Sequence, residues 1–344
     1  MGAPLQPHQR KIVMLVVVIL VVVGLAYIAF PQGAYEIKYR GRTMGTTWSV
    51  KIHSDQKYDP EIANAIQSEL DFVEHLMSNW REESDVSRFN RSEINSCTSA
   101  NVVTLAVVVT SQRISDLSDG AFDVTIGPVI DLWGFGSKFN KQNIPEQEDV
   151  DEALARTGLQ SMYVTDDQIC KRDKNVELNV SGIAKGYAVD RVAMKLDSLK
   201  LNNYLVEVGG ELKAQGLNGR GTYWTVGVEQ PNHDLLAAGY RTAVPLVNTA
   251  IATSGDYRNF FEVSGSKYSH IIDPTTGYPV THNLASVTVL ASSSMEADAW
   301  ATALLVLGPE KGMEIAKLQS LAVLMIVRKD EGFEIQASEN WPKS

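Results

Sequence analysis

The sequence contains little cysteine and no excess of basic residues. Cys97 and Cys170 are its two cysteines, too few to form a metal cage alone, and their spacing matches no zinc-binding pattern. If the folded part is exported they could form one disulfide, although the sequence alone does not bring their Cα atoms together. The formal net charge of −10 argues against a nucleic-acid surface, because neutralising phosphates requires clustered lysine and arginine.

Familiar catalytic motifs are also missing. The chain has no Gly-x-Ser-x-Gly elbow, so a hydrolase triad has little support. It has no Walker A loop, which requires a different glycine spacing and a Ser or Thr after the lysine. Internal repeats and long runs of like charge are absent as well.

One long hydrophobic run is present near the N-terminus. Ile12–Phe30 is a stretch of 19 residues without a charge, preceded by His8, Arg10 and Lys11. This length is close to the roughly 20 residues that cross a bilayer, whereas the apolar run of a cleaved signal peptide usually has about 7–15. Gly24-Leu25-Ala26 could pass as a cleavage site, but the unbroken run favours an uncleaved single-span anchor. Residues 1–11 are then cytoplasmic, residues 12–30 form the span, and residues 35–340 form a domain on the far side.

The rest of the chain shows strands in runs, interrupted by a few long helices. Alternation predicts strands at Tyr35–Tyr39 and Thr47–Ile52, and Asp85–Asn90 has the composition of a polar turn. The expected helices are 58–78, 102–117, 183–200, 293–307 and 309–317. This order favours an α+β domain, with antiparallel or mixed sheets and packed helices, over a doubly wound one.

The stretch Leu178–Asp190 is the first candidate for chemistry. We expect a strand at Asn175–Val180, a tight turn at Ser181-Gly182 and a helix from Ile183. Gly182 would let the backbone approach a ligand, and free N–H groups at the start of a helix favour an anion. Lys185 in the first turn opposes the helix dipole, which indicates a role other than helix stabilisation. The alternative is a solvated lysine on an ordinary strand–turn–helix.

A second candidate lies on the helix that follows Ser293. Ser293 and Glu296 fit a capping box, and Gly308-Pro309 supplies the stop. Asp298 and Thr302 are four residues apart and therefore share one helix face. A carboxylate, a hydroxyl and backbone carbonyls are hard oxygen ligands suited to Mg²⁺. The alternative is a buried aspartate that is hydrogen-bonded to Thr302 or to backbone amides.

Other residues are open to either a functional or a structural interpretation. The turn Asp273-Pro274-Thr275-Thr276-Gly277 leaves His270 at the end of an expected strand, His270–Ile272, where it could be a general base or a structural histidine. The aromatics and glycines of residues 120–136 could form a wall for a planar ring or belong to the core. Met44 and Trp80 are core residues by default.

Taken in order, these segments resemble one known family. The chain is similar to the ApbE-type FAD:protein FMN transferases from about Tyr39 to Val327, and seven ordered motifs make a chance match very improbable. The motifs are Thr43-Met44-Gly45-Thr46-Thr47, Gly120-Ala121-Phe122-Asp123-Val124-Thr125, Gly182-Ile183-Ala184-Lys185-Gly186-Tyr187-Ala188, Val208-Gly209-Gly210-Glu211, Thr253-Ser254-Gly255-Asp256-Tyr257, His270-Ile271-Ile272-Asp273-Pro274 and Glu296-Ala297-Asp298-Ala299.

The resemblance implies an ApbE-like, T-fold-like domain and a Mg²⁺-dependent enzyme. Such an enzyme takes FMN from FAD, attaches it through a phosphoester bond to a Thr or Ser of a target flavoprotein, and releases AMP. Typical acceptors are subunits of redox-driven ion pumps, such as the sodium-translocating NADH:quinone reductase and its Rnf relatives. A single-pass protein of the bacterial inner membrane, with its catalytic domain in the periplasm, fits such acceptors.

The resemblance also implies roles for individual residues. The metal ligands would be Asp298, Thr302 and the backbone carbonyl of Gly182, and the catalytic residues would be His270, as the base, and Lys185. The FAD site would comprise Met44, Trp80, Ala121, Phe122, Asp123, Asn179, Lys185 and Ile272.

Two positions depart from the family pattern. Many members have Asp where this chain has Asn179, and some have a second Asp where it has Ala301. Two other functions are compatible with the same motifs. One is a Mg²⁺-dependent FAD pyrophosphatase, and the other is a non-catalytic periplasmic FAD-binding protein.

Overall fold

The computed structural model describes residues 14, 35–137, 143–229, 240–257 and 259–342. Apart from Met14, the expected span Ile12–Phe30 lies outside these residues. None of the helices within the described ranges has the length and apolar character needed to cross a membrane.

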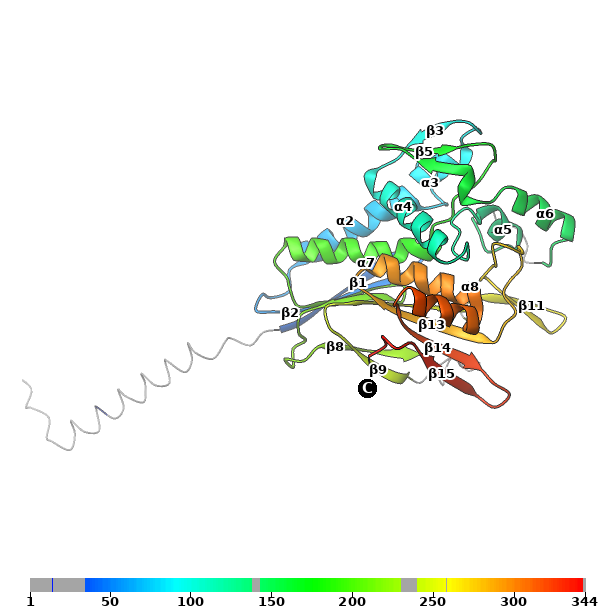
Figure 1. Cartoon of the computed structure of the whole chain (residues 1–344). Coiled ribbons are helices and arrows are strands. Elements are labelled where there is room, and N and C mark those ends of the chain that lie inside the picture. The colour runs from blue at the N-terminus through cyan, green and yellow to red at the C-terminus, as the bar shows by residue number, and fades with distance from the viewer. Residues whose placement is uncertain (1–13, 15–34, 138–142, 230–239, 258, 343–344) are drawn as a thin grey trace, which may run out of the picture.

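The centre of the molecule is an antiparallel sheet of eight strands in the order β1-β2-β6-β7-β10-β13-β14-β15 (Figure 1). Each neighbouring pair in this order is antiparallel. The strands are β1 (Tyr35–Thr43), β2 (Thr46–Ser54), β6 (Tyr204–Val208), β7 (Glu211–Gln215), β10 (Ala250–Gly255), β13 (Leu284–Ala291), β14 (Ala322–Arg328) and β15 (Phe333–Ala337).

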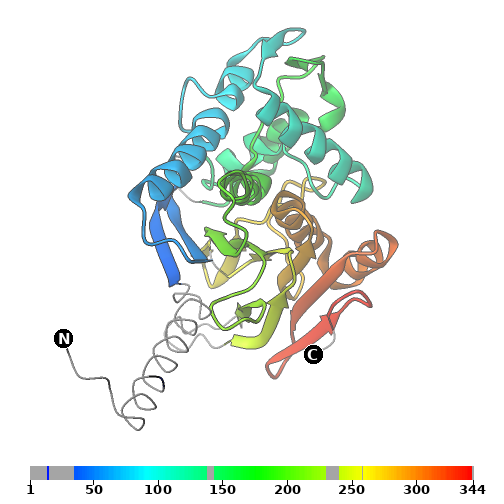
Figure 2. The same ribbon diagram turned by 90° about the vertical axis from the view of Figure 1, so that its left-hand side faces the viewer.

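The sheet is covered on both faces. One face carries the helices α2 (Pro60–Met77), α7 (Ser181–Ser198) and α8 (Ser294–Leu318) (Figure 1). A further helix, α4 (Val102–Leu117), packs on this helical layer. The other face carries the antiparallel pair β8 (Trp224–Glu229) and β9 (Tyr240–Leu246). Along β14, Val323 and Met325 belong to the core under the helices, whereas Leu324 and Ile326 belong to the core under the hairpin. This alternation is the period-2 pattern of a sheet that is buried on both faces. Figure 2 shows α7 nearly end-on with α8 beside it.

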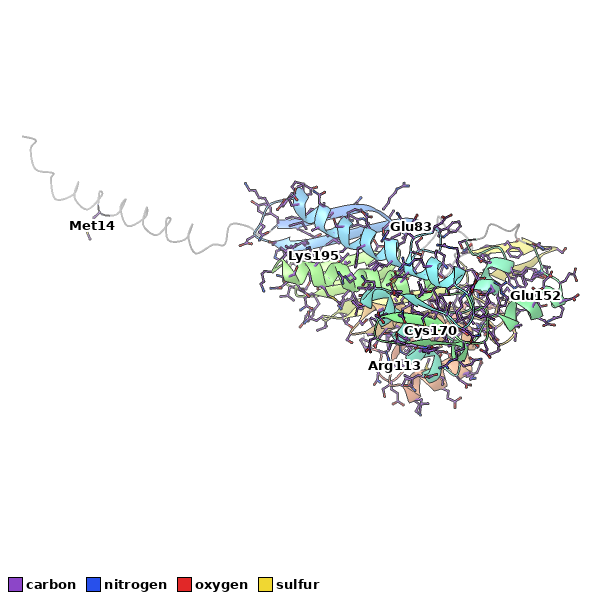
Figure 3. The ribbon with its side chains drawn as sticks, turned by 90° about the horizontal axis from the view of Figure 1, so that it is seen from above. Met14, Glu83, Arg113, Glu152, Cys170 and Lys195 are labelled. Atoms are coloured by element: carbon purple, nitrogen blue, oxygen red, sulfur yellow. A yellow bond between two sulfur atoms is a disulfide. The ribbon has the colours of Figure 1, made fainter. Side chains whose placement is uncertain are left out.

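Smaller elements extend the helical side of the molecule. They are α3 (Asp85–Arg91), β3 (Cys97–Ser99), α5 (Gly127–Leu132), α6 (Gln147–Ala155), the 3₁₀ helix η1 (Leu159–Ser161), β4 (Met162–Val164), β5 (Gln168–Lys171), β11 (Phe260–Val263) and β12 (Ser266–Ser269). Cys97 and Cys170 face each other on β3 and β5 with their Cα atoms 4.0 Å apart, and they form a disulfide (Cys170 is labelled in Figure 3). The expected α+β class, with antiparallel sheets and packed helices, is confirmed.

Several local expectations were wrong. Asp85–Asn90 lies within α3 and is not a turn, because the Ser84 hydroxyl caps the helix by accepting from the Ser87 amide, and Val86 and Phe89 are buried three residues apart. β12 ends at Ser269, so His270 follows the strand instead of starting one.

The region before α7 also differs from expectation. Asn175–Val180 is not a strand; within the described residues it makes an isolated bridge between Glu177 and Ile126. α7 begins at Ser181, so Ser181 and Gly182 belong to the first turn and Lys185 to the second. The dipole argument for Lys185 is therefore weaker than expected, since the effect falls off within the first turn.

Candidate active site

Two glycines of α7 allow it to approach α8 closely. A Cβ atom at Gly186 would lie 2.2 Å from the Ser294 carbonyl oxygen, so only glycine fits there. The Gly186 amide donates a hydrogen bond to Asp298 Oδ2 at 3.0 Å. A Cβ atom at Gly182 would lie 3.2 Å from Thr302 Oγ1. The two segments that the sequence singled out are therefore adjacent in the structure.

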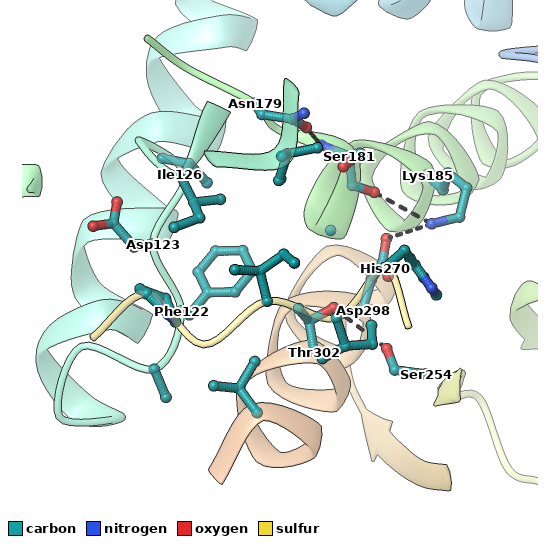
Figure 4. A pocket seen from close by; sticks show the side chains of 18 of the residues that line it. Phe122, Asp123, Ile126, Asn179, Ser181, Lys185, Ser254, His270, Asp298 and Thr302 are labelled. Atoms are coloured by element: carbon teal, nitrogen blue, oxygen red, sulfur yellow. Dashed lines mark hydrogen bonds and ion pairs between the residues drawn. The ribbon is translucent and has the colours of Figure 1, made fainter. Parts of the chain in front are cut away.

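A cavity of about 310 Å³ opens where these segments meet (Figure 4). Six of the predicted FAD-site residues line it, together with the predicted base and the three predicted metal-ligating residues. The predicted residues in its wall are Ala121, Phe122, Asp123, Asn179, Gly182, Lys185, His270, Ile272, Asp298 and Thr302, ten in all when every role is counted. Phe122 is buried in this wall, and its ring lies close to Gly182, with Cε2 3.3 Å from the position of a Cβ there.

Lys185 lies between two buried carboxylates. Its Nζ is 3.5 Å from Glu211 Oε1 and 3.7 Å from Asp298 Oδ2, and it donates to the Ser181 carbonyl at 3.3 Å. Burial acts to lower the pKa of Lys185, but the charges of Asp298 and Glu211 outweigh burial and raise this pKa above its ordinary value. Lys185 is therefore a cation at neutral pH in the wall of the cavity.

Glu211 is a site residue that the sequence analysis did not assign. It begins β7 directly after Gly209 and Gly210, which have φ angles of 60° and 107° and turn the chain toward the cavity. Burial raises the pKa of Glu211 to about 8, against the opposing charge of Lys185. Among the described residues, its Oε2 atom is buried without a hydrogen-bond partner. The motif Val208-Gly209-Gly210-Glu211 was the signal that could have identified it.

His270 lines the cavity and has one ring nitrogen without a hydrogen. Its Nδ1 lies 2.9 Å from the carbonyl oxygen of Asn259, and because a carbonyl only accepts, Nδ1 carries the hydrogen and Nε2 is the free base. Burial lowers the pKa of His270, and the Lys185 charge acts in the same direction. The imidazole is therefore neutral near pH 7, the form that a general base requires.

The polar residues opposite α8 are held by local hydrogen bonds. Asp123 Oδ1 accepts from the Thr125 amide at 2.7 Å and from the Thr125 hydroxyl at 2.6 Å, and burial raises the pKa of Asp123. Asn179 Oδ1 accepts from the Ser181 amide at 3.1 Å, which satisfies one of the donors at the start of α7. Both side chains are thus fixed before any ligand enters.

Met44 and Trp80 lie in a second cavity of about 510 Å³, which shares Ser181 and Lys185 with the first. Trp80 is 71% exposed, so its default assignment to the core was wrong. Met44 has a φ angle of 47° at the β1–β2 turn, and its amide donates to Glu74 Oε2 at 3.0 Å. The predicted flavin-site residues therefore occupy two adjoining cavities with Lys185 at their junction.

The oxygen atoms near Gly182 fit a magnesium ion. Asp298 supplies a carboxylate and Thr302 a hydroxyl, which lies 3.3 Å from the Ser254 hydroxyl, and the backbone carbonyl of Gly182 is on the adjoining helix. No group of three or more His, Cys, Asp or Glu side chains that could hold a metal occurs in the described part of the chain. Mg²⁺ suits such a sparse set, because it keeps water ligands and is commonly bound by one or two carboxylates together with substrate phosphates.

Comparisons with known proteins place this geometry in a family. The profile of the ApbE family matches residues 44–325. The FAD:protein FMN transferase of Escherichia coli strain K12 is 40% identical over 299 residues, covering 86% of this chain and 85% of the relative. The Vibrio cholerae protein of the same name is 40% identical over 314 residues, covering 90% and 92%.

Solved structures agree with the sequence relatives. The flavin transferase ApbE of Vibrio cholerae superposes with a TM-score of 0.82 at 38% identity, covering 90% of this chain and 98% of that one. The apo form of the Pseudomonas stutzeri flavinyl transferase ApbE gives a TM-score of 0.82 at 37% identity, covering 89% and 96%. The chain therefore belongs to the ApbE family, the FAD:protein FMN transferases that its motifs resemble.

Proposed function

We propose that the enzyme transfers FMN from FAD to a Thr or Ser hydroxyl of an acceptor flavoprotein, forming a phosphoester and releasing AMP. The observation that carries this proposal is the meeting of Lys185, Asp298, Thr302 and His270 around one cavity. Breaking a diphosphate requires neutralisation of its charge and an aligned hydroxyl, and this cavity provides groups for both.

The metal would be held by Asp298, Thr302 and the Gly182 carbonyl. When bound, Mg²⁺ supplies neutralisation of the negative charge on the diphosphate. Ala301, buried in α8, adds no second carboxylate, so the substrate and water would complete the coordination.

The protein groups have separate tasks in the transfer. The Lys185 cation attracts the phosphate oxygens, and Phe122 offers an apolar surface beside them. His270 Nε2 takes the proton of the acceptor hydroxyl. The hydroxyl oxygen bonds to the FMN phosphorus, and the bond between that phosphorus and the bridging oxygen breaks so that AMP leaves with this oxygen.

The acceptor and the location are also proposals. Flavoprotein subunits of the NADH:quinone reductase or Rnf type are the expected acceptors, by resemblance. The run Ile12–Phe30 with its basic flank supports a single-pass anchor in the bacterial inner membrane with the domain in the periplasm. The Cys97–Cys170 disulfide supports that location, because disulfides persist in oxidising compartments.

One assay tests the reaction against its two alternatives. The full chain is incubated with FAD, Mg²⁺ and an acceptor domain, and in-gel flavin fluorescence and AMP are both measured. AMP with a fluorescent acceptor supports the transferase, AMP without label indicates an FAD pyrophosphatase, and neither product indicates an FAD-binding protein. Either of the last two results would overturn the proposal.

A further inference from the structure

Leu178 lies three residues before the start of α7, and its backbone amide and carbonyl are both hydrogen-bonded by side chains. Leu178 is fully buried, and Val176 and Val180, two residues to either side, are buried as well. A buried backbone amide and carbonyl must be paired, or their desolvation costs free energy. In a sheet, a neighbouring strand would supply both partners.

Here a side chain takes the place of that strand. The Leu178 amide donates to Asn90 Oδ1 at 2.7 Å, and Asn90 Nδ2 donates back to the Leu178 carbonyl at 2.9 Å. Asn79 Nδ2 donates to the same carbonyl at 2.7 Å. One carboxamide thus makes the pair of hydrogen bonds that a strand residue would make. This substitution explains why a strand pattern in the sequence corresponds to no strand in the structure.

Asn90 is itself firmly placed. It lies on α3 between Phe89, which is fully buried, and Arg91, and its backbone carbonyl accepts from Lys171 Nζ at 3.0 Å. On the far side of the segment, the Asn179 amide donates to the Val124 carbonyl at 2.6 Å. The segment before α7 is therefore hydrogen-bonded to α3 through Leu178 and to the Phe122–Val124 segment through Asn179.

From these contacts we infer that Asn90 is a positioning residue for the flavin site, an inference that rests on the proposed function. Both polar atoms of its carboxamide bond Leu178, and Asn90 lines neither of the two cavities described above, so we assign its effect to the backbone of Leu178. The residue that follows Leu178 is Asn179, whose side chain bonds the Ser181 amide at the start of α7 (Figure 4). Asn90 thereby sets the place of Asn179 and of the first two turns of α7, which carry Gly182 and Lys185.

The experiment compares the variants Asn90→Ala and Asn90→Asp, the second of which is isosteric, with the control variant Asn218→Ala. Asn90→Asp keeps the acceptor for the Leu178 amide but sets a carboxylate oxygen against the Leu178 carbonyl. Asn218 is the control, because its side chain also bonds the main chain with both polar atoms, donating to the Tyr223 carbonyl at 2.9 Å and accepting from the Arg220 amide at 2.9 Å. Asn218 lies in the β7–β8 connection and lines neither cavity.

Two readouts are taken on the full chain, well below the melting temperature of every variant. The first is the FAD dissociation constant from flavin fluorescence. The second is hydrogen exchange of residues 176–185 by mass spectrometry, without ligand. We expect both Asn90 variants to weaken FAD binding about tenfold or more and to lose protection in 176–185, whereas Asn218→Ala does neither.

The outcomes separate this inference from the proposed function. If the Asn90 variants melt earlier but bind FAD as the wild type does, or keep wild-type protection in 176–185, Asn90 is merely structural and the inference is overturned. If Asn90→Ala does not fold, the isosteric Asn90→Asp decides on the same two readouts. Failure of the wild type to label an acceptor overturns the proposed function, and the exchange measurement still decides the role of Asn90.

Discussion

At the scale of single residues, His270 is the group whose protonation state matters most for transfer. Replacing it with Ala should lower acceptor labelling by about 10²–10⁴-fold, the usual contribution of a general base, while FAD binding survives. Since burial lowers the pKa of His270 below its ordinary 6.5, the neutral form predominates at neutral pH. His270 itself should therefore add no pH dependence above pH 6.5, and its protonation should lower the rate only as the pH drops further. A labelling rate close to that of the wild type in His270→Ala would show that another group takes the proton.

Thr302 allows the metal to be tested separately from the fold. Thr302→Val keeps the shape of the side chain but removes the hydroxyl that faces Gly182, whereas Thr302→Ser keeps the hydroxyl. We expect Thr302→Val to raise the Mg²⁺ concentration for half-maximal activity by at least about 10–100-fold, the loss seen for outer-shell partners, and Thr302→Ser to change it little. Magnesium titrations of both variants measure this. Equal titration curves for the two variants would remove Thr302 from the set of ligands.

Asp298 serves both the proposed metal and Lys185. Its replacement by Ala should abolish activity and Mg²⁺ dependence together, because it removes the one carboxylate of the proposed set and a charge partner of Lys185. Isothermal titration with Mg²⁺ in the presence of FAD provides a measurement that does not depend on turnover. Retained Mg²⁺ binding in this variant would place the ion elsewhere.

At the scale of elements, the close packing of α7 against α8 depends on Gly186, which has no side chain. Alanine is about 1 kcal/mol better than glycine inside a helix, so propensity alone predicts that Gly186→Ala stabilises α7. The added Cβ would lie 2.2 Å from the Ser294 carbonyl oxygen and 2.8 Å from Asp298 Cβ. We expect the clash to prevail, with a net loss of about 1–3 kcal/mol in urea unfolding. Gly182→Ala, where the nearest atom is 3.2 Å away, is the comparison and should cost less stability.

The elements also show where sequence patterns suffice and where they do not. α4 has the bounds Val102–Leu117 that its periodicity predicts, and the Gly308-Pro309 stop appears as a break in α8, where Gly308 has a φ angle of 78°. Asn175–Val180 has the right alternation for a strand, but the amide and carbonyl of Leu178 bond the side chain of Asn90 on α3. Periodicity reports which side chains are buried and not which group pairs with the backbone.

At the scale of the whole molecule, the disulfide joins positions separated by 73 residues. A link that closes so long a loop restricts the unfolded chain, and its removal should cost about 2–5 kcal/mol. We therefore expect reductant, or the pair Cys97→Ser and Cys170→Ser, to lower the melting temperature while leaving transfer intact at lower temperature, since neither cysteine lines either cavity. Thermal melts with and without reductant measure this. An unchanged melting temperature would show that the link contributes little.

The assembly of the site was less predictable than its components. Asp298 and Lys185 could be singled out individually, because a carboxylate on an apolar helix face and a lysine early in a helix each need explanation. Their separation of 3.7 Å depends on the sheet order, which brings β7 beside β10 and lays α7 against α8. Glu211 shows the same limit, because it is buried only once β7 takes its place in the sheet. From the sequence, only the resemblance to the ApbE family indicated which distant segments come together at the site.

The wall of the 310 Å³ cavity draws on the chain from Ala121 to Val306, with contributions from helices, loops, β7 and β10. During synthesis, the last of these groups emerges only after most of the polypeptide has been made. A growing chain therefore has no partial version of this pocket, and neither does a fragment that stops before α8. The 310 Å³ cavity can therefore bind a ligand only after α8 has been made and packed, so a ligand of this cavity cannot act as a template for the early steps of folding.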